Sequence, residues 1–177
     1  MLGSWTISGV NEMIVQPQRE ELTLSWMGVQ DAISRAVPKL QIHTFERLLA
    51  VTRGGLVPTA LIGNALNIRD IDCIGAISYT GGVKKGTAVV NRPPSPEEFN
   101  NPKTLIVDDI TDTGATMIVL SRIYPNATKF AVVAKPLGIP HVNGFVVNVN
   151  QDVWVNFPWE DIRKGGAPLH EESGLPS

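Results

Sequence analysis

Short apolar runs recur along the chain and are separated by stretches with a helical period. Residues Arg47–Thr52 read RLLAVT, which is typical of a strand buried on both faces of a parallel sheet. Runs of similar length and character predict further strands over Leu22–Leu24, Ile71–Tyr79, Thr104–Val107, Lys129–Ala134 and Phe145–Val149.

The stretches between these runs predict helices. The first helix begins after Ser25, which suits an N-cap, and is expected to end at Pro38. Its apolar residues recur at helical spacing and are Val29, Ile33, Ala36 and Val37. Two further helices are predicted over Leu56–Asn67 and over residues 114–124, where Pro125 stops the pattern.

The alternation of strands and helices predicts one α/β domain over residues 21–162, with a central parallel sheet and helices on both faces. Residues 1–20 have no clear period and form an extension of uncertain order. Residues 163–177 are interpreted as a loose tail. Residues 80–103 are interpreted as a flexible loop. Ligands of parallel sheets bind beyond the carboxyl ends of the strands, so the residues there are the candidates for function.

The overall charge argues against nucleic acid as a partner. The 177 residues include 15 Lys and Arg against 17 Asp and Glu, a formal net charge of −2, so no broad basic surface is expected. No apolar run reaches the length that spans a bilayer, and the N-terminus lacks a signal-peptide pattern, so we expect a cytoplasmic protein. The single cysteine, Cys73, lies in an apolar run and is expected in the core.

The strongest chemical signal is the segment Thr104–Thr116, which reads TLIVDDITDTGAT. Its apolar strand brings Asp108 and Asp109 to the sheet edge, where carboxylates suit Mg²⁺ or a pair of sugar hydroxyls. A solvated acidic turn is the alternative interpretation. The small hydroxylated residues that follow enter a helix, whose N-terminal amides and dipole favour an anion. Plain helix capping by Asp112 or Thr113 would use the same backbone donors.

A second signal is the turn that follows the predicted strand Arg47–Thr52. Arg53 precedes Gly54 and Gly55. Glycine lets a backbone approach a ligand closely, and arginine offers a fork of donors to an anion. Alone this turn is weak evidence for an anion site, but it becomes stronger beside the acidic segment described above.

The acidic segment closely resembles the phosphoribosyl pyrophosphate (PRPP) signature of the type I phosphoribosyltransferases. The turn at Arg53 resembles the pyrophosphate loop of that family, in which a peptide bond is often cis. The resemblance implies the type I phosphoribosyltransferase fold, with a small hood built from the C-terminal region. It assigns Asp108 and Asp109 to the ribose hydroxyls, directly or through Mg²⁺, and Arg53 and Gly54 to pyrophosphate. It assigns the 5′-phosphate to Asp112, Thr113, Gly114, Ala115 and Thr116.

The residues after the predicted strand Lys129–Ala134 narrow the choice of acceptor base. An Ala-Lys-Pro tripeptide at Lys135 and the run QDVWVNFPW from Gln151 are similar to those of the bacterial xanthine-guanine phosphoribosyltransferases. In that group a strand-end lysine donates to O6 of the purine, which implicates Lys135. A tryptophan stacks on the base and adjacent main-chain carbonyls accept from its 2-amino group, which implicates Trp154 and Val155. A solvated lysine and a core or interface tryptophan are the alternatives.

The resemblance therefore implies purine salvage, in which the phosphoribosyl group of PRPP passes to guanine or xanthine, with hypoxanthine as a further candidate. Asp112 is the candidate general base or proton relay, and Arg53 and Lys135 are the other predicted catalytic residues. Asp108 and Asp109 are the predicted ligands of Mg²⁺. The resembling group also implies a homo-oligomer, either a dimer or a tetramer.

The loop 80–103 is the predicted lid over the reaction, because water would hydrolyse PRPP in an open site. Tyr79 lies at its start, and Lys84 and Lys85 are its candidate contacts to pyrophosphate. The lid of the resembling family also begins just after a Ser-Tyr pair, here Ser78-Tyr79. The assignment of Lys84 and Lys85 rests on position alone, since this loop differs from that of the family in length and sequence.

Three other functions remain open from the sequence. The first is a phosphoribosyltransferase for another nucleobase. The second is a non-catalytic regulator that senses PRPP or a nucleotide on the same fold, which the lack of a basic excess or of an added DNA-binding domain disfavours. The third is an Mg²⁺-dependent nucleotide hydrolase, which would need a phosphate-binding loop that Gly81–Thr87 does not match in spacing.

Overall fold

The computed structural model describes residues 20–79, 87–91 and 93–160 of the 177-residue chain. In this part of the chain, the main sheet has six strands in the order β4-β3-β2-β5-β6-β7. The strands are β2 (Arg47–Thr52), β3 (Asp70–Tyr79), β4 (Thr87–Asn91), β5 (Thr104–Thr111), β6 (Thr128–Ala134) and β7 (Gly144–Asn148). All neighbours pair parallel except β4, which pairs antiparallel with β3 at one edge. The predicted parallel sheet is therefore confirmed, with one antiparallel edge strand added.

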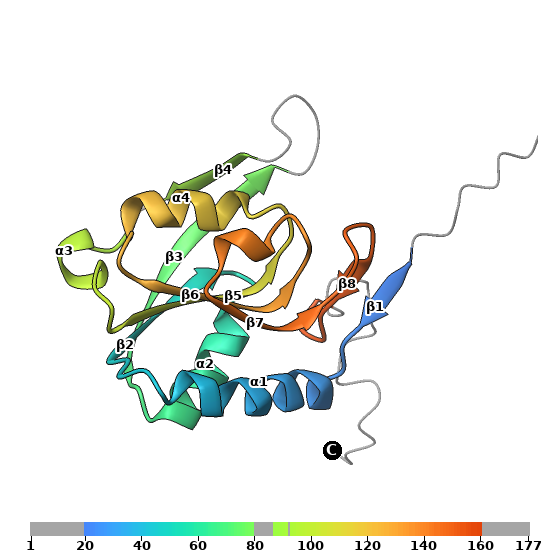
Figure 1. The fold of residues 1–177 in the computed structure, drawn as a ribbon, viewed down its shortest axis with the longest axis horizontal. Helices are drawn as coiled ribbons and strands as arrows, with labels where there is room; N and C mark the ends of the chain where they lie inside the picture. Colours follow the sequence, from blue (N-terminus) through green and yellow to red (C-terminus); the bar gives the residue numbers. More distant parts are fainter. Residues whose placement is uncertain (1–19, 80–86, 92, 161–177) are drawn as a thin grey trace, which may run out of the picture.

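Helices cover both faces of this sheet, as the sequence predicts (Figure 1). α1 (Trp26–Leu40) and α2 (Leu56–Leu66) lie on one face, and α4 (Ala115–Ile123) lies on the other. The core is divided accordingly. Leu48, Leu105 and Val107 belong to the cluster under α1 and α2, whereas Leu49, Ile106 and Met117 belong to the cluster under α4. Alternate residues of β2 and β5 thus feed opposite faces, as strand geometry requires.

The helix α1 begins as predicted and ends two residues later than predicted. The side chain of Ser25 accepts a hydrogen bond from the Gly28 amide at 3.0 Å and so caps the helix. Pro38 lies inside the helix, which continues to Leu40, so the predicted end at Pro38 is wrong. Leu40, the last residue of the helix, is buried and packs into the core.

The predicted loop 80–103 contains a strand and a short helix, so its interpretation as a loop over the whole range is wrong, whereas its role as a lid stays a prediction. Residues 87–91 form β4, and Pro96–Phe99 form the short helix α3. Phe99 is buried in the cluster under α4. The only sequence signal for β4 is the short apolar run Ala88, Val89 and Val90. This signal is weak because lysines precede the run and prolines follow it.

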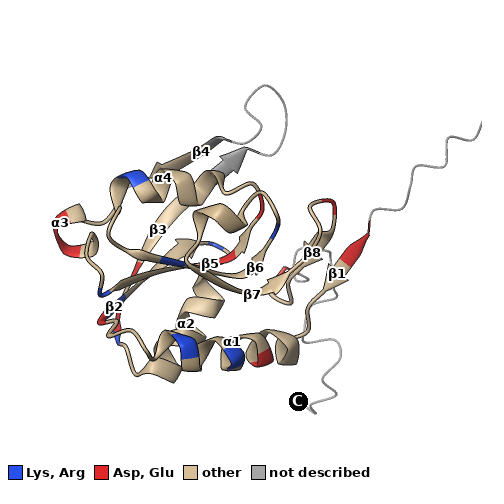
Figure 2. Cartoon of the chain, viewed as in Figure 1, with Lys and Arg blue, Asp and Glu red and all other residues tan. Residues whose placement is uncertain are grey.

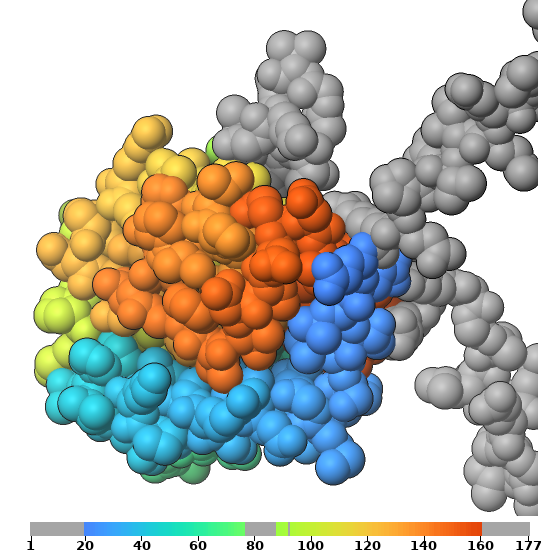
Figure 3. Space-filling model, turned by 45° about the vertical axis from the view of Figure 1, so that its right-hand side comes forward, coloured from blue at the N-terminus to red at the C-terminus, as the bar shows by residue number. Residues whose placement is uncertain are grey.

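A second, two-stranded sheet lies at the carboxyl end of the main sheet. β1 (Glu21–Thr23) pairs parallel with β8 (Trp154–Asn156), with Leu22 opposite Val155. The predicted hood was assigned to the C-terminal region alone. The structure shows that the N-terminal strand forms half of this small sheet, and Figure 3 shows the two segments in contact on the surface.

Two further observations concern the surface. Cys73 is exposed, which contradicts its predicted place in the core; Ile74, the next residue on β3, is the one buried under α4. Lys and Arg are spread over several elements of the described chain, as are Asp and Glu (Figure 2). None of the helices in the described residues has the length and apolar character needed to cross a bilayer.

Candidate active site

The predicted carboxylate pair lies within β5, because this strand continues past the apolar run to Thr111. The extra residues of β5 stay paired with β6, with Asp108 opposite Ala131. Asp108 is 8% exposed, and its carboxylate accepts a hydrogen bond from the Asp109 amide at 3.0 Å. Asp109 is half-buried and its carboxylate accepts from the Ile110 amide at 2.7 Å. Both carboxylates are therefore held by local backbone amides at the carboxyl half of the strand.

Burial makes the negative charge of this pair costly. The pKa of Asp108 is raised well above its ordinary value, first by burial and then by the neighbouring charge of Asp109. Burial also raises the pKa of Asp109, and the charge of Glu160 adds to this shift. A cation or a set of hydroxyl donors at this place would relieve the cost. No local sequence pattern connects Glu160 with this pair, which lies about fifty positions earlier in the chain.

The residues after β5 form the predicted phosphate loop at the start of α4. Gly114 is the N-cap of α4 and has φ 79°, a left-handed conformation that favours glycine. A Cβ atom at this position would overlap the imidazole ring of His141, which belongs to the short 3₁₀ helix η2 (Ile139–His141). The Thr113 hydroxyl accepts from the Ala115 amide at 3.4 Å. The loop thus combines a helix N-terminus with close backbone packing, which suits an anion.

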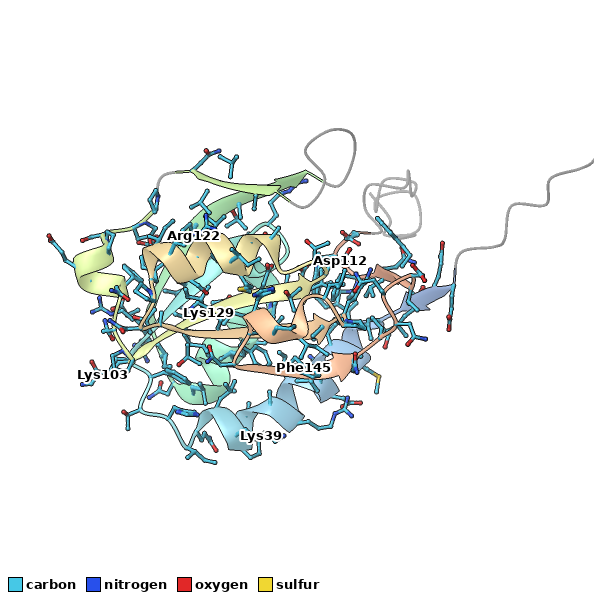
Figure 4. All side chains as sticks on the ribbon, turned by 45° about the horizontal axis from the view of Figure 1, so that its top comes forward. Lys39, Lys103, Asp112, Arg122, Lys129 and Phe145 are labelled. Carbon is cyan, nitrogen blue, oxygen red and sulfur yellow. The ribbon has the colours of Figure 1, made fainter. Side chains whose placement is uncertain are left out.

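The structure brings Asp112 and Lys135 together. The Lys135 ammonium lies 3.4 Å from the Asp112 carboxylate, and the two side chains are 3% and 43% exposed. Lys135 follows β6 directly, and its amide donates to the Thr111 carbonyl at 3.0 Å. Asp112 lies at the carboxyl end of the sheet, opposite in the molecule to Lys103, which precedes β5 (Figure 4). A buried cationic donor and a more exposed carboxylate acceptor are therefore neighbours at the ligand end of the sheet.

Gln151 is a site residue that sequence reasoning did not single out. Its amide nitrogen lies 2.5 Å from a carboxylate oxygen of Asp112 and donates to it. Its amide oxygen accepts from the Leu137 amide at 3.0 Å. The predicted QDVWVNFPW run contained this glutamine, but a contact with Asp112, which is 39 positions away, leaves no local pattern.

The predicted pyrophosphate turn lies beside the carboxylate pair. The peptide between Thr52 and Arg53 is cis, as the resemblance implies. A Cβ atom at Gly54 would overlap the Asp109 carboxylate, so only glycine allows this turn and β5 to approach so closely. Arg53 is exposed at the same end of the sheet, which leaves its guanidinium accessible to a ligand.

The predicted purine-binding residues lie on β8. Trp154 is 46% exposed, whereas the side chain of Val155 is buried in the core. The Trp154 indole nitrogen donates to the Asn156 side chain at 3.2 Å, and Asn156 donates to Glu21 of β1 at 3.1 Å. The Trp154 amide donates to the Glu20 carbonyl at 2.8 Å. Strand β1 is therefore hydrogen-bonded to β8, the strand that carries Trp154, which is predicted to stack on the purine.

Lys84 and Lys85 lie outside the described residues, as does the side chain of Tyr79. Within the described part of the chain, no group of three or more His, Cys, Asp or Glu side chains could hold a metal ion. Asp108 and Asp109 offer two neighbouring carboxylates, and Mg²⁺ in proteins commonly binds one or two carboxylates together with substrate oxygens.

Comparison with known families identifies the fold. The family model described as "Phosphoribosyl transferase domain" matches residues 29–160, which is more than half of the chain and includes every predicted site residue from Arg53 to Val155. The chain belongs to the phosphoribosyltransferase family. The match includes the cis peptide before Arg53, the acidic strand β5 and the loop into α4. These are the segments whose sequences resemble the family's signature.

Curated members of the phosphoribosyltransferase family are similar over most of their length. The xanthine-guanine phosphoribosyltransferase of Desulfotalea psychrophila is 40% identical over 147 residues, which cover 82% of this chain and 90% of that protein. The xanthine-guanine phosphoribosyltransferase of Idiomarina loihiensis is 36% identical over 141 residues, which cover 79% and 87%.

Solved structures of this family share the fold at lower identity. The Helicobacter pylori xanthine-guanine-hypoxanthine phosphoribosyltransferase has a TM-score of 0.67 and 22% identity, covering 82% of this chain and 97% of that chain. A purine phosphoribosyltransferase from Pyrococcus horikoshii has a TM-score of 0.65 and 24% identity, covering 84% and 97%. These likenesses support the type I fold.

Proposed function

We propose that this phosphoribosyltransferase transfers the phosphoribosyl group of PRPP to a 6-oxopurine, giving a nucleoside 5′-monophosphate and pyrophosphate. The observation that carries the proposal is the Lys135–Asp112 pair, with 3.4 Å between ammonium and carboxylate. O6 and N7 of a 6-oxopurine lie on one edge of the base. A donor beside an acceptor matches an oxo group beside a protonated ring nitrogen, and adenine carries a 6-amino group where the donor would need an acceptor.

Guanine and xanthine are the proposed acceptors, with hypoxanthine as a further candidate. The printed names of the similar proteins from Desulfotalea psychrophila and Idiomarina loihiensis support this choice. We assign stacking on the base to Trp154, whose indole is partly exposed. We assign the recognition of a 2-substituent to the main chain at Trp154 and Val155. A site built around a hydrogen bond rejects a base that leaves a buried group unpaired.

The reaction would be a displacement at C1′ of PRPP. A ring nitrogen of the purine forms a bond to C1′ while the bond from C1′ to the pyrophosphate oxygen breaks, and the proton that the base must lose passes to Asp112. The 5′-phosphate would lie on the loop from Thr113 to Thr116. Arg53 and the amide region of Gly54 would offset the charge that gathers on pyrophosphate.

Asp108 and Asp109 would hold the ribose hydroxyls, with or without Mg²⁺. The donor set fits this ion, because the two side chains offer hard oxygen ligands whose raised pKa values reflect charge that burial leaves poorly compensated. When bound with PRPP, the ion would supply positive charge to the pyrophosphate oxygens. The residues of this chain hold the sugar and position the phosphate in either case.

The proposal is tested by incubating the protein with PRPP and Mg²⁺ and each of guanine, xanthine, hypoxanthine, adenine, uracil and orotate, while pyrophosphate release is followed. We expect release with one or more of the 6-oxopurines and little with adenine. Release with orotate or uracil alone would reject the assignment of the base. No release with any base would reject catalysis and favour a regulator that binds PRPP or a nucleotide.

A further inference from the structure

The side chain of Gln151 links three loops at the ligand end of the sheet. Its amide oxygen accepts from the Leu137 amide, two residues after Lys135. Its amide nitrogen donates to the Asp112 carboxylate at 2.5 Å and lies 3.4 Å from the Asp112 carbonyl oxygen. Gln151 itself lies just before β8, which carries Trp154. The half-buried amide of Gln151 therefore connects the segments that carry Asp112, Lys135 and Trp154. These are the proposed general base, the proposed donor to the purine and the residue proposed to stack on it.

The chemistry of the two partners fixes the orientation of this amide. The Leu137 N–H can only donate, and the Asp112 carboxylate can only accept. The amide oxygen must therefore face Leu137 and the amide nitrogen must face Asp112. A glutamate at this position could accept from Leu137, but its second oxygen would repel the carboxylate. Of glutamine and glutamate, only glutamine can make both hydrogen bonds.

Gln151 and Lys135 divide the two oxygens of the Asp112 carboxylate between them. The amide of Gln151 holds Oδ1, and the ammonium of Lys135 lies 3.4 Å from Oδ2. When Lys135 donates to the 6-oxo group of a base, Oδ2 is the oxygen that gains room to accept the purine proton. Oδ1 stays bound to Gln151. Because the amide is neutral, it fixes the plane of the carboxylate without neutralising its charge.

We propose that Gln151 is a positioning residue for the transfer reaction, which holds Asp112 in the orientation that accepts the proton of the base. This inference rests on the proposed function, since it needs Asp112 to act on the purine. A misplacement of about 1 Å in a reacting group can cost roughly a hundredfold in rate. The glutamine should therefore act on the rate of transfer far more than on the binding of PRPP.

Three single variants separate this role from simple packing. Gln151→Met removes both hydrogen bonds at similar volume, and Gln151→Glu keeps the acceptor for Leu137 while it loses the donor to Asp112. Asn150→Ala changes an exposed amide one residue earlier and is the matched control. We expect kcat with guanine to fall about 10- to 100-fold in both Gln151 variants, with KM for PRPP within about twofold of wild type. The control should stay within about twofold in both constants.

A second background tests whether Gln151 acts through Asp112. In the variant Asp112→Asn, adding Gln151→Met should lower kcat by less than about threefold, because the group that Gln151 positions has already lost its function. The thermal midpoint of each variant is measured in parallel. Should Gln151→Met fold poorly, Gln151→Glu carries the comparison, since its contact with Leu137 persists.

The outcomes distinguish the inference from the function on which it rests. A wild-type protein without activity on any base overturns the proposed function itself. An active wild type whose Gln151 variants keep kcat within about threefold overturns only the role of Gln151. Equal losses from Gln151→Met in the wild-type and Asp112→Asn backgrounds also overturn it, because the glutamine would then act independently of Asp112.

Discussion

At the scale of single residues, the proposed chemistry depends on the contact between the buried ammonium of Lys135 and the carboxylate of Asp112. Lys135 is 3% exposed, and a buried ammonium needs a nearby carboxylate or a set of acceptors. Asp112 supplies that carboxylate when no purine is bound. An incoming 6-oxo group can replace it as an acceptor, so the same lysine can serve both states.

The substitution Lys135→Met tests the role of this lysine. We expect KM for guanine to rise about tenfold or more, since a hydrogen bond from a charged donor contributes roughly 1.5–3 kcal/mol. The affinity for PRPP, measured by calorimetry, should stay within about threefold. Lys39→Met is the matched control, because Lys39 is an exposed lysine on α1 (Figure 4). A collapse of PRPP affinity in Lys135→Met would contradict the assignment to the purine.

The substitution Asp108→Asn should stabilise the ligand-free protein at neutral pH while it lowers activity. The pKa of Asp108 is raised in the folded state, so this carboxyl binds its proton more tightly there than in the unfolded chain. Its contribution to stability is full below the unfolded value of 3.8 and is lost as the pH rises through the folded pKa. At pH 7 the wild type therefore bears a cost that asparagine removes.

This stability effect is measured by thermal unfolding in the presence of a chelator. We expect the midpoint of Asp108→Asn to exceed that of the wild type at pH 7 by a few degrees, which corresponds to about 1 kcal/mol for a domain of this size. The difference should shrink as the pH falls towards the unfolded value. A variant that is less stable than the wild type at pH 7 would show that the carboxylate is well compensated in the fold.

At the scale of elements, the turn from β5 into α4 is held by backbone packing that only glycine permits. Gly114 is left-handed and abuts His141 of η2. Gly138, just before η2, is constrained by a close contact alone, because a Cβ atom there would overlap the Thr111 carbonyl. The end of β5, the start of α4 and the turn after β6 therefore form one packed unit, and the proposed phosphate loop is part of it.

The substitution Gly114→Ala should disturb this unit. The new methyl group needs a left-handed backbone and collides with His141, so we expect a loss of about 1–3 kcal/mol in stability and at least tenfold weaker binding of PRPP. Gly144→Ala in β7 is the control, since the nearest atom to its new Cβ is Phe130 Cδ2 at 3.6 Å. Thermal unfolding and calorimetry measure both effects. Equal behaviour of the two variants would contradict the proposed constraint.

The apolar pattern of the sequence predicts most elements but only some of their ends. The predicted strand Arg47–Thr52 matches β2 at both ends. The predicted strand Thr104–Val107 was too short, because the polar residues up to Thr111 are held by pairing with β6, and pairing partners are not visible in a local pattern. The strand β4 was missed because its apolar residues are few and depend on pairing with β3.

At the scale of the whole molecule, the two ends of the domain meet at the site. β1, near the N-terminus, pairs with β8, which carries Trp154. The indole of Trp154, the amide of Asn156 and the carboxylate of Glu21 form a chain of hydrogen bonds across this small sheet. The resemblance implies that Trp154 stacks on the purine. The hydrogen bond between Glu21 and Asn156 joins residues 135 positions apart, and no local sequence pattern predicts it. The same limit explains why Gln151 and Glu160 were missed.

The substitution Glu21→Ala tests this long-range support. We expect KM for the purine to rise about three- to tenfold, which corresponds to the loss of one hydrogen bond, or roughly 1 kcal/mol. KM for PRPP should not change, because the phosphate loop and β2 lie on the main sheet. Glu20→Ala is the control, since Glu20 contacts Trp154 through its backbone carbonyl. Steady-state kinetics with both substrates measure the difference, and equal rises in both KM values would contradict it.

The central claim is that β5 presents its carboxylates to a ribose while the entrance of α4 binds a phosphate. A crystal structure of the protein with guanosine 5′-monophosphate tests it most directly. We predict the ribose hydroxyls at Asp108 and Asp109, the phosphate at residues 113–116, and the base between Lys135 and Trp154. A nucleotide bound elsewhere, with this site empty, would contradict the account.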